Sequence, residues 1–158
     1  MIRKALNRFW QVIASALRQG ATPRKLAIAC AMGCVISIFP VFGTTTLLCF
    51  LVAIAFRLNI VVIQTVNYLL TPIQVVMLIP FMQGGILLFN LTPVSLDVNE
   101  LMLRFKNGFG ALIMELGGVI LGGIAMWMMV AIPLFFLLFF IFHALLLRWM
   151  RREVKELS

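Results

Sequence analysis

A short series of amide and hydroxyl side chains lies inside a long apolar stretch of the sequence. The series consists of Gln64, Asn67, Thr71 and Gln74. Spacings of three, four and three residues place these side chains on one face of a helix. Such a face could form a polar track for a lipid headgroup or an ion, whereas the alternative role is hydrogen bonding between neighbouring helices. Pro72 lacks an amide hydrogen and would leave the carbonyl of Tyr68 free beside this face.

Two charged residues, Arg57 and Glu115, interrupt the apolar stretches, one in each half of the chain. Ionisable groups at membrane depth are costly and are commonly functional. Arg57 could hold a lipid phosphate, and Glu115 could exchange a proton to couple transport. Alternatively, Arg57 only extends its charged end to the membrane surface at the end of a helical hairpin.

The residues at 39–46 predict a turn between two helices. Pro40 ends the first helix, Gly43 permits a tight turn, and Thr44 begins the second helix. If this turn lies inside the membrane, the first amides of the second helix and its dipole favour a phosphate or another anion. The alternative is a plain interfacial loop between two ordinary membrane spans.

The sequence offers little support for enzymatic chemistry. The three cysteines lie in one apolar segment, and their odd number indicates small buried side chains, not disulfides or metal ligands. Ser37 and His143 could form a hydrolytic pair, but no third orienting group or oxyanion motif accompanies them. We therefore expect neither an enzyme nor a metal or other cofactor.

Composition places these residues in a lipid environment. Of 158 residues, 63% are hydrophobic and 11% are charged, and the mean hydropathy is +1.12. Soluble domains contain about 45–50% apolar and about 25% charged residues. The net charge of +8 comes mainly from basic residues that flank the apolar segments, which favours anionic membrane lipids as partners and argues against nucleic acid.

The sequence predicts three elements in the first half of the chain. A basic amphipathic helix is predicted at 1–25, lying in the headgroup region or packed on another chain. The uncharged segment 26–56 has 31 residues and would measure about 46 Å as one helix, against a hydrocarbon core of roughly 30 Å. Together with its central turn, this length predicts a re-entrant hairpin. Residues 58–90 predict one kinked transmembrane helix.

The second half repeats this order. An amphipathic helix is predicted at 94–107, a glycine-broken re-entrant hairpin at 108–123, a transmembrane helix at 124–147 and a basic cytoplasmic tail at 148–158. The fold class is therefore an all-α integral membrane protein with a single membrane domain and an inverted repeat. Two crossings place both basic ends in the cytoplasm, in agreement with the positive-inside rule. Four plain crossings satisfy the same rule and are the structural alternative.

A set of residues in the first half resembles a known bacterial membrane family. These residues are Thr22, Pro23, Arg24, Leu26, Ala27, Ala31, Gly33, Pro40, Gly43, Thr44, Leu58, Asn59, Asn67, Thr71, Pro72 and Gly85. They resemble domain of unknown function family 2062, which is similar to the DedA (VTT, SNARE-associated) superfamily. The resemblance implies paired re-entrant helices and a role in transport or lipid scrambling. The family's Asn-Pro-x-Thr motif is altered here, because the proline follows the threonine.

We therefore expect a transporter or scramblase-like protein of the bacterial inner membrane. Its substrate would be a phospholipid, a lipid carrier or another anionic amphiphile, and a homo-oligomer is compatible with this role. The alternatives are an exporter of small solutes or ions and a membrane scaffold or assembly partner that transports nothing.

Overall fold

The computed structural model describes residues 9, 11–17, 20–41, 43–91 and 109–156, with the backbone alone at 109–116 and 151–156. These residues are helical apart from short connections, and no strand occurs among them. A helical segment at 11–17 is followed by α2 (Pro23–Ser37), α3 (Thr45–Ala55), α4 (Ile60–Phe89) and α6 (Phe109–Glu156). The predicted amphipathic helix at 94–107 lies outside the described residues.

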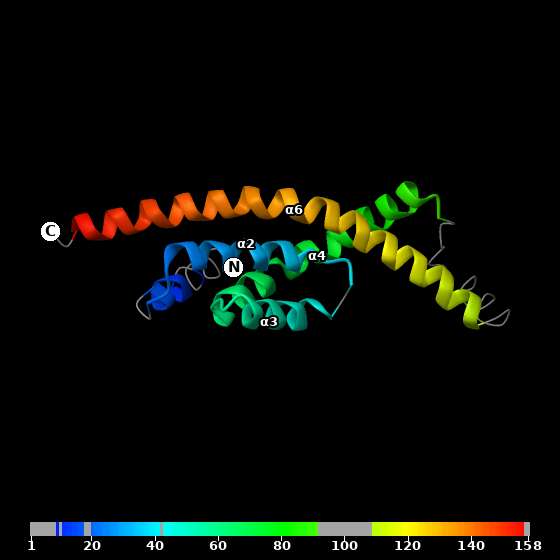
Figure 1. Cartoon of the computed structure of the whole chain (residues 1–158), viewed down its shortest axis with the longest axis horizontal. Helices are drawn as coiled ribbons and strands as arrows, with labels where there is room; N and C mark the ends of the chain where they lie inside the picture. The colour runs from blue at the N-terminus through cyan, green and yellow to red at the C-terminus, as the bar shows by residue number, and fades with distance from the viewer. Residues whose placement is uncertain (1–8, 10, 18–19, 42, 92–108, 157–158) are drawn as a thin grey trace.

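The helices form an elongated bundle around α4. Figure 1 shows α6 along the long axis of the molecule, with α2 beside the half of α6 that is nearer the C-terminus. α4 contacts α2, α3 and α6, and α2 also contacts both α3 and α6. The chain reverses between α2 and α3, so this region contains a helix, a turn and a second helix, and re-entry into a membrane stays a prediction.

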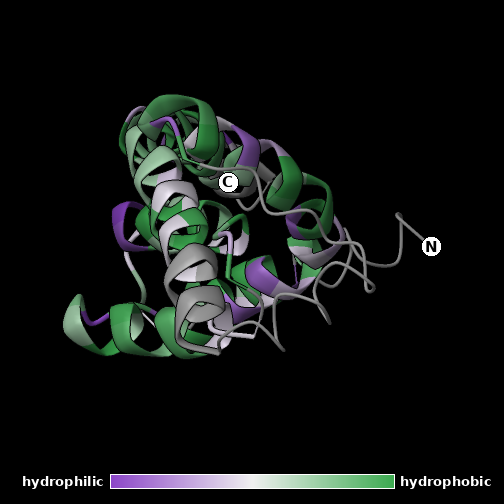
Figure 2. Cartoon of the chain, turned by 90° about the vertical axis from the view of Figure 1, so that its right-hand side faces the viewer, coloured by the Kyte–Doolittle hydropathy of each residue, from purple (hydrophilic) through white to green (hydrophobic). Residues whose placement is uncertain are grey.

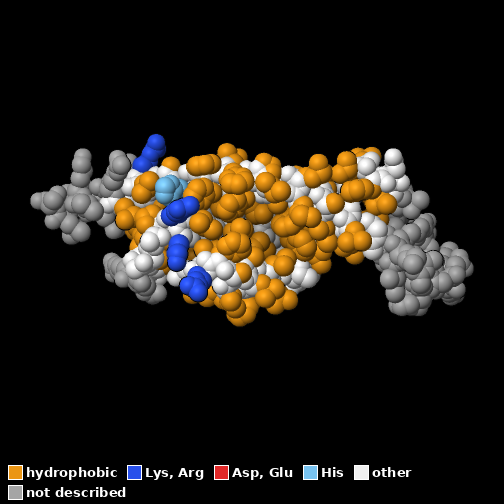
Figure 3. Space-filling view, viewed as in Figure 1, with side chains coloured by type: hydrophobic (Ala, Val, Ile, Leu, Met, Phe, Trp, Pro, Cys, Tyr) orange, Lys and Arg blue, Asp and Glu red, His pale blue; other side chains and the backbone are white. Residues whose placement is uncertain are grey.

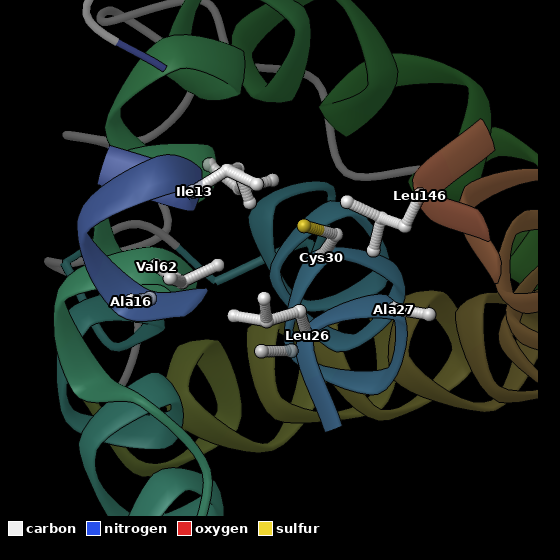
Figure 4. Packing of buried hydrophobic residues seen from close by; sticks show 9 residues of the cluster. Ile13, Ala16, Leu26, Ala27, Cys30, Val62 and Leu146 are labelled. Carbon is white, nitrogen blue, oxygen red and sulfur yellow. The ribbon is translucent and has the colours of Figure 1, made fainter. Parts of the chain in front are cut away.

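The N-terminal segment packs against the helices of its own chain. Ile13 and Ala16 are 0% and 2% exposed and belong to one apolar cluster with residues of α2, α4 and α6. Figure 4 shows the side chains of this cluster, with Cys30 of α2 between Ile13 and Leu146 of α6. The segment is also shorter than the predicted helix at 1–25, because Gly20 adopts a φ of +86° and the chain turns before α2.

Local signals in the sequence explain where α2 and α4 begin. Thr22 caps α2 by accepting a hydrogen bond from the Lys25 amide at 3.3 Å, and Pro23 follows as the first helical residue. Asn59 caps α4 through its Oδ1 atom, which accepts from two free amides of the first turn at 3.0 and 3.2 Å. α4 ends at Asn90, whose φ is +48°. The predicted helix at 58–90 is thus present as one continuous helix.

The predicted hairpin at 108–123 is not present, because α6 is continuous from Phe109 to Glu156. The glycines expected to break this region lie within the helix, and one of them meets a glycine of α4 at close range. A Cβ atom on Gly85 would lie 2.3 Å from the carbonyl carbon of Gly122. These glycines therefore permit close packing of two backbones. Without a second hairpin in the described residues, the inverted repeat remains a prediction.

Two helical segments are long and apolar enough to cross a membrane. They are α4 and the part of α6 at Gly117–Met150, and only 17% and 11% of their most apolar windows are buried in the molecule. Large hydrophobic side chains are exposed along α3, α4 and α6, and Figures 2 and 3 show apolar residues along these helices. An exposed apolar surface of this extent marks a contact with lipid or protein.

Candidate functional site

The polar side chains of α4 face the α2–α3 hairpin. Asn67 and Gln74 are each 3% exposed, although they lie in the middle of an apolar helix. Buried amides of this kind require hydrogen-bond partners, because an unpaired polar group is costly to bury. The partners of Gln64 and Gln74 are backbone carbonyl groups on either side of the turn between α2 and α3. We call Gln64, Asn67 and Gln74 the polar cluster.

The end of α2 is held by two side chains from different helices. Gln74 of α4 donates through Nε2 to the carbonyl of Phe39 at 3.0 Å. Trp127 of α6 donates through Nε1 to the carbonyl of Val35 at 3.1 Å. The rings of Phe39 and Trp127 also meet edge to face, with centroids 4.8 Å apart. The last turn of α2 is therefore fixed to α6, and the residues just after it are fixed to α4, so that free carbonyls at this helix end are partly satisfied.

Gln64 makes the corresponding contact with the start of α3. Its Nε2 atom donates to the carbonyl of Thr46 at 3.0 Å. Its Oε1 atom is buried and has no hydrogen-bond partner among the described residues. A buried acceptor without a partner is costly, and it is available to a donor from a ligand or from water.

The turn residues predicted to bind an anion adopt different roles. Pro40 is fully buried, whereas Gly43 has a φ of +80° and open space around its α-carbon. The hydroxyl of Thr44 donates back to the carbonyl of Val41 at 3.0 Å and does not cap α3. The first amides of α3 consequently lack a side-chain cap. Thr71 likewise bonds within its own helix, to the carbonyl of Asn67 at 3.1 Å.

Arg57 follows α3 at the end of that helix that lies away from the α2–α3 turn. Its φ is +50°, and the amide of Leu58 donates to the carbonyl of Ala53 at 2.8 Å. This pattern is a Schellman motif, in which glycine usually takes the position of Arg57. The exposed Arg57 side chain borders a hollow of about 310 Å³.

Comparison with known proteins identifies the family. A family model described as "Uncharacterized protein conserved in bacteria (DUF2062)" matches residues 6–155. The chain belongs to this bacterial family. No curated protein and no solved structure matches the chain. The further similarity to the DedA superfamily gains no support from these comparisons and stays an expectation.

Other predicted residues of this DUF2062 member fall outside the polar cluster. The side chain of Glu115 lies outside the described residues, although its backbone is part of α6. The hydroxyl of Ser37 donates to the carbonyl of Cys34 at 2.7 Å, and His143 stacks on Phe139 with ring centroids 5.6 Å apart. Among the described residues, no group of three His, Cys, Asp or Glu side chains could hold a metal ion.

Trp127 and Phe39 were not predicted as partners at the end of α2. An indole inside an apolar helix is typical of a membrane segment and does not identify its partner. Its role depends on the carbonyl of Val35, which is free because the amide of Phe39 donates to Ile36 instead. The helix end predicted before Pro40 could have indicated such a contact, because the last carbonyls of a helix lack partners in that helix and need a donor from elsewhere.

Proposed function

We propose that this protein is an integral membrane protein of the bacterial inner membrane that moves an anionic amphiphile, a phospholipid or a lipid carrier, between the two leaflets. Both termini would lie in the cytoplasm. The observation that carries the proposal is the position of the charges on an otherwise apolar molecule. Arg24, Lys25, Arg57 and Arg148 are all the charged side chains that the structure describes, and all are basic. Figure 3 shows the visible Lys and Arg side chains toward one end of the molecule.

The apolar surface supports a location in lipid. α4 has 30 residues and would measure about 45 Å, which exceeds the hydrocarbon thickness of roughly 30 Å and permits a tilted crossing. Most of its surface is not covered by other helices. Basic residues concentrate on the cytoplasmic side of inner-membrane proteins, where they attract anionic lipids. The basic end is accordingly assigned to the cytoplasmic surface.

The polar face of α4 supports a path for a headgroup through this apolar molecule. In the proposed mechanism, a headgroup enters from the basic end and passes between α3 and α4, while its acyl chains stay on the exposed apolar surface of α3. The Nε2 atoms of Gln64 and Gln74 would exchange their carbonyl partners for headgroup oxygens. The unpartnered Oε1 of Gln64 would accept from a headgroup hydroxyl. Glu115 is retained as the proposed residue for proton coupling.

Reconstitution tests this function. Proteoliposomes would carry fluorescent phosphatidylglycerol or phosphatidylcholine, and dithionite quenching would report the lipids that reach the outer leaflet. We expect faster exchange of phosphatidylglycerol than in protein-free vesicles, and a slower rate for Gln64→Leu. Thr65→Val is the matched control, because the Thr65 hydroxyl donates to the carbonyl of Val61 in its own helix. Solute efflux without lipid exchange would indicate an exporter, and the absence of both would refute transport.

A membrane scaffold is the second candidate function. The observation that favours it is the use of Gln64 and Gln74 in contacts within the chain, where they join α4 to α3 and to the turn. A scaffold predicts that Gln64→Leu lowers stability and association without any lipid exchange in the wild type. The same proteoliposome assay therefore separates the two functions.

A further inference from the structure

The basic end contains a hollow formed by three separate parts of the chain. It has a volume of about 310 Å³, near the lower limit of the roughly 300–1,000 Å³ found for small-molecule sites. Its lining comprises the end of the N-terminal helical segment, the start of α2 and the link between α3 and α4. The polar residues of this lining are Thr22, Lys25, Arg57 and Asn59. A hollow of this size suits a headgroup better than a whole lipid.

The charges around the hollow favour an anion. Lys25 and Arg57 both line it, and Arg24 precedes Lys25 on the exposed start of α2. Every acidic residue of the chain lies outside the described side chains, so neither cation has an ionic partner in the described part. Two cations that face one hollow repel each other when it is empty, and an anion between them removes this repulsion.

The two helix starts at the hollow add further donors. α2 and α4 both begin beside it, so the positive ends of their dipoles lie near the hollow. The Thr22 oxygen accepts from the Lys25 amide, which leaves the hydroxyl hydrogen free to donate. The Asn59 oxygen accepts from the amides of Val61 and Val62, which leaves both hydrogens of its NH2 group available.

The backbone fixes Arg57 at the rim of the hollow. The Schellman motif at the end of α3 sets the direction of the chain at Arg57, and Asn59 then caps α4 two residues later. Arg57 therefore reaches the hollow from one side, while Lys25 approaches from the start of α2. A guanidinium can form two parallel hydrogen bonds with a phosphate, and an ammonium contributes a point charge.

We propose that the hollow between Lys25 and Arg57 binds a phosphate group, carried either by a lipid headgroup or by a soluble phosphate. This inference deepens the proposed function and rests on it for the membrane setting of the ligand. Lys25 and Arg57 neutralise the phosphate, and Thr22 and Asn59 donate to its remaining oxygens. The exposed apolar side chains of α3 and α4 next to Arg57 lie where acyl chains of a bound lipid would run.

Titration of the full chain in an uncharged maltoside detergent tests the site. The two probes are inorganic phosphate and dihexanoyl phosphatidic acid, measured by calorimetry. The variants are Arg57→Gly and Lys25→Gln, each of which removes one charge. Glycine suits the positive φ of position 57, so Arg57→Gly retains the turn and should unfold at the same temperature as the wild type or higher. Arg148→Gln is the matched control, because Arg148 is exposed and does not line the hollow.

We expect each pocket variant to weaken binding by about ten-fold or more, and the control to bind as the wild type does. Binding of both probes indicates a general phosphate site. Binding of phosphatidic acid alone indicates a lipid headgroup as the ligand, and binding of inorganic phosphate alone indicates a soluble phosphate. Absence of binding, or equal weakening in Arg148→Gln, overturns the proposal. Intact binding without lipid exchange contradicts only the proposed transport, and lipid exchange without binding contradicts only the pocket.

Discussion

The crossing of α4 and α6 allows a sharp test of the packing. A Cβ atom at Gly85 would lie 2.3 Å from the carbonyl carbon of Gly122 and 2.6 Å from the amide nitrogen of Gly123. Ordinary contact begins at 3.4 Å, so the change Gly85→Ala requires the two backbones to separate by 1.1 Å, the difference between 3.4 and 2.3 Å. Neither neighbouring atom can move aside, because both belong to the backbone of a long helix.

The expected magnitude combines two opposing effects. Overpacking of a close contact costs about 1–3 kcal/mol of unfolding free energy, and a gap of about 1 Å loses a quarter to a half of the dispersion energy at the crossing. Alanine also stabilises a helix by about 0.8–1 kcal/mol relative to glycine. Gly85→Ala should therefore lower the unfolding free energy by up to about 2 kcal/mol, whereas an open position should gain stability.

The chain supplies two controls for this prediction. Gly117 is open, because among the described residues no atom of another part of the chain lies within 4 Å of its Cβ position. The three atoms nearest to a Cβ atom on Gly84 would all belong to the flexible side chain of Met126, the closest of them at 3.0 Å. The unfolding free energy, measured in mixed micelles, should be highest for Gly117→Ala, intermediate for Gly84→Ala and lowest for Gly85→Ala. A Gly85→Ala variant as stable as Gly117→Ala would refute the close crossing.

Three further predictions concern the polar contacts. Gln74→Leu should lower the unfolding free energy by about 1–3 kcal/mol, because the carbonyl of Phe39 loses its donor in a partly buried place. An unfolding free energy equal to that of the wild type would contradict this role. Trp127→Phe should keep the ring contact with Phe39 but lose the hydrogen bond to the carbonyl of Val35. The denaturant concentration at its unfolding midpoint should therefore lie between those of the wild type and Trp127→Ala. Asn59→Ala should cost about 0.5–2 kcal/mol through loss of the cap of α4, and Asn59→Asp should restore most of this loss in the same unfolding assay.

The sequence was sufficient for features that depend on neighbouring residues. The bounds of α4 follow from Asn59 and Asn90, whose side chains and backbone preferences act within one turn. The reversal between α2 and α3 follows from Pro40 and Gly43 for the same reason. The common face of Gln64 and Gln74 could also be predicted, because helical periodicity alone determines it.

Features that depend on distant residues could not be predicted from one sequence. Gly122 would fit a helix break as well as a helix contact, and only its position opposite Gly85 decides between them. The partners of Gln64 and Gln74 are backbone carbonyls, which every residue possesses, so no residue type indicates them.

The apolar cluster has a consequence for the time at which the protein folds. It joins Ile13, near the start of the chain, to Leu146 of α6, so its members are as many as 133 residues apart, the difference between positions 146 and 13. During synthesis, the N-terminal segment emerges long before its partners in α6 exist. The packing site of Ile13 is therefore complete only after Leu146 has been made. Contacts between such distant parts of a sequence form slowly, and until then the apolar side of this segment must be sheltered by lipid or by a chaperone.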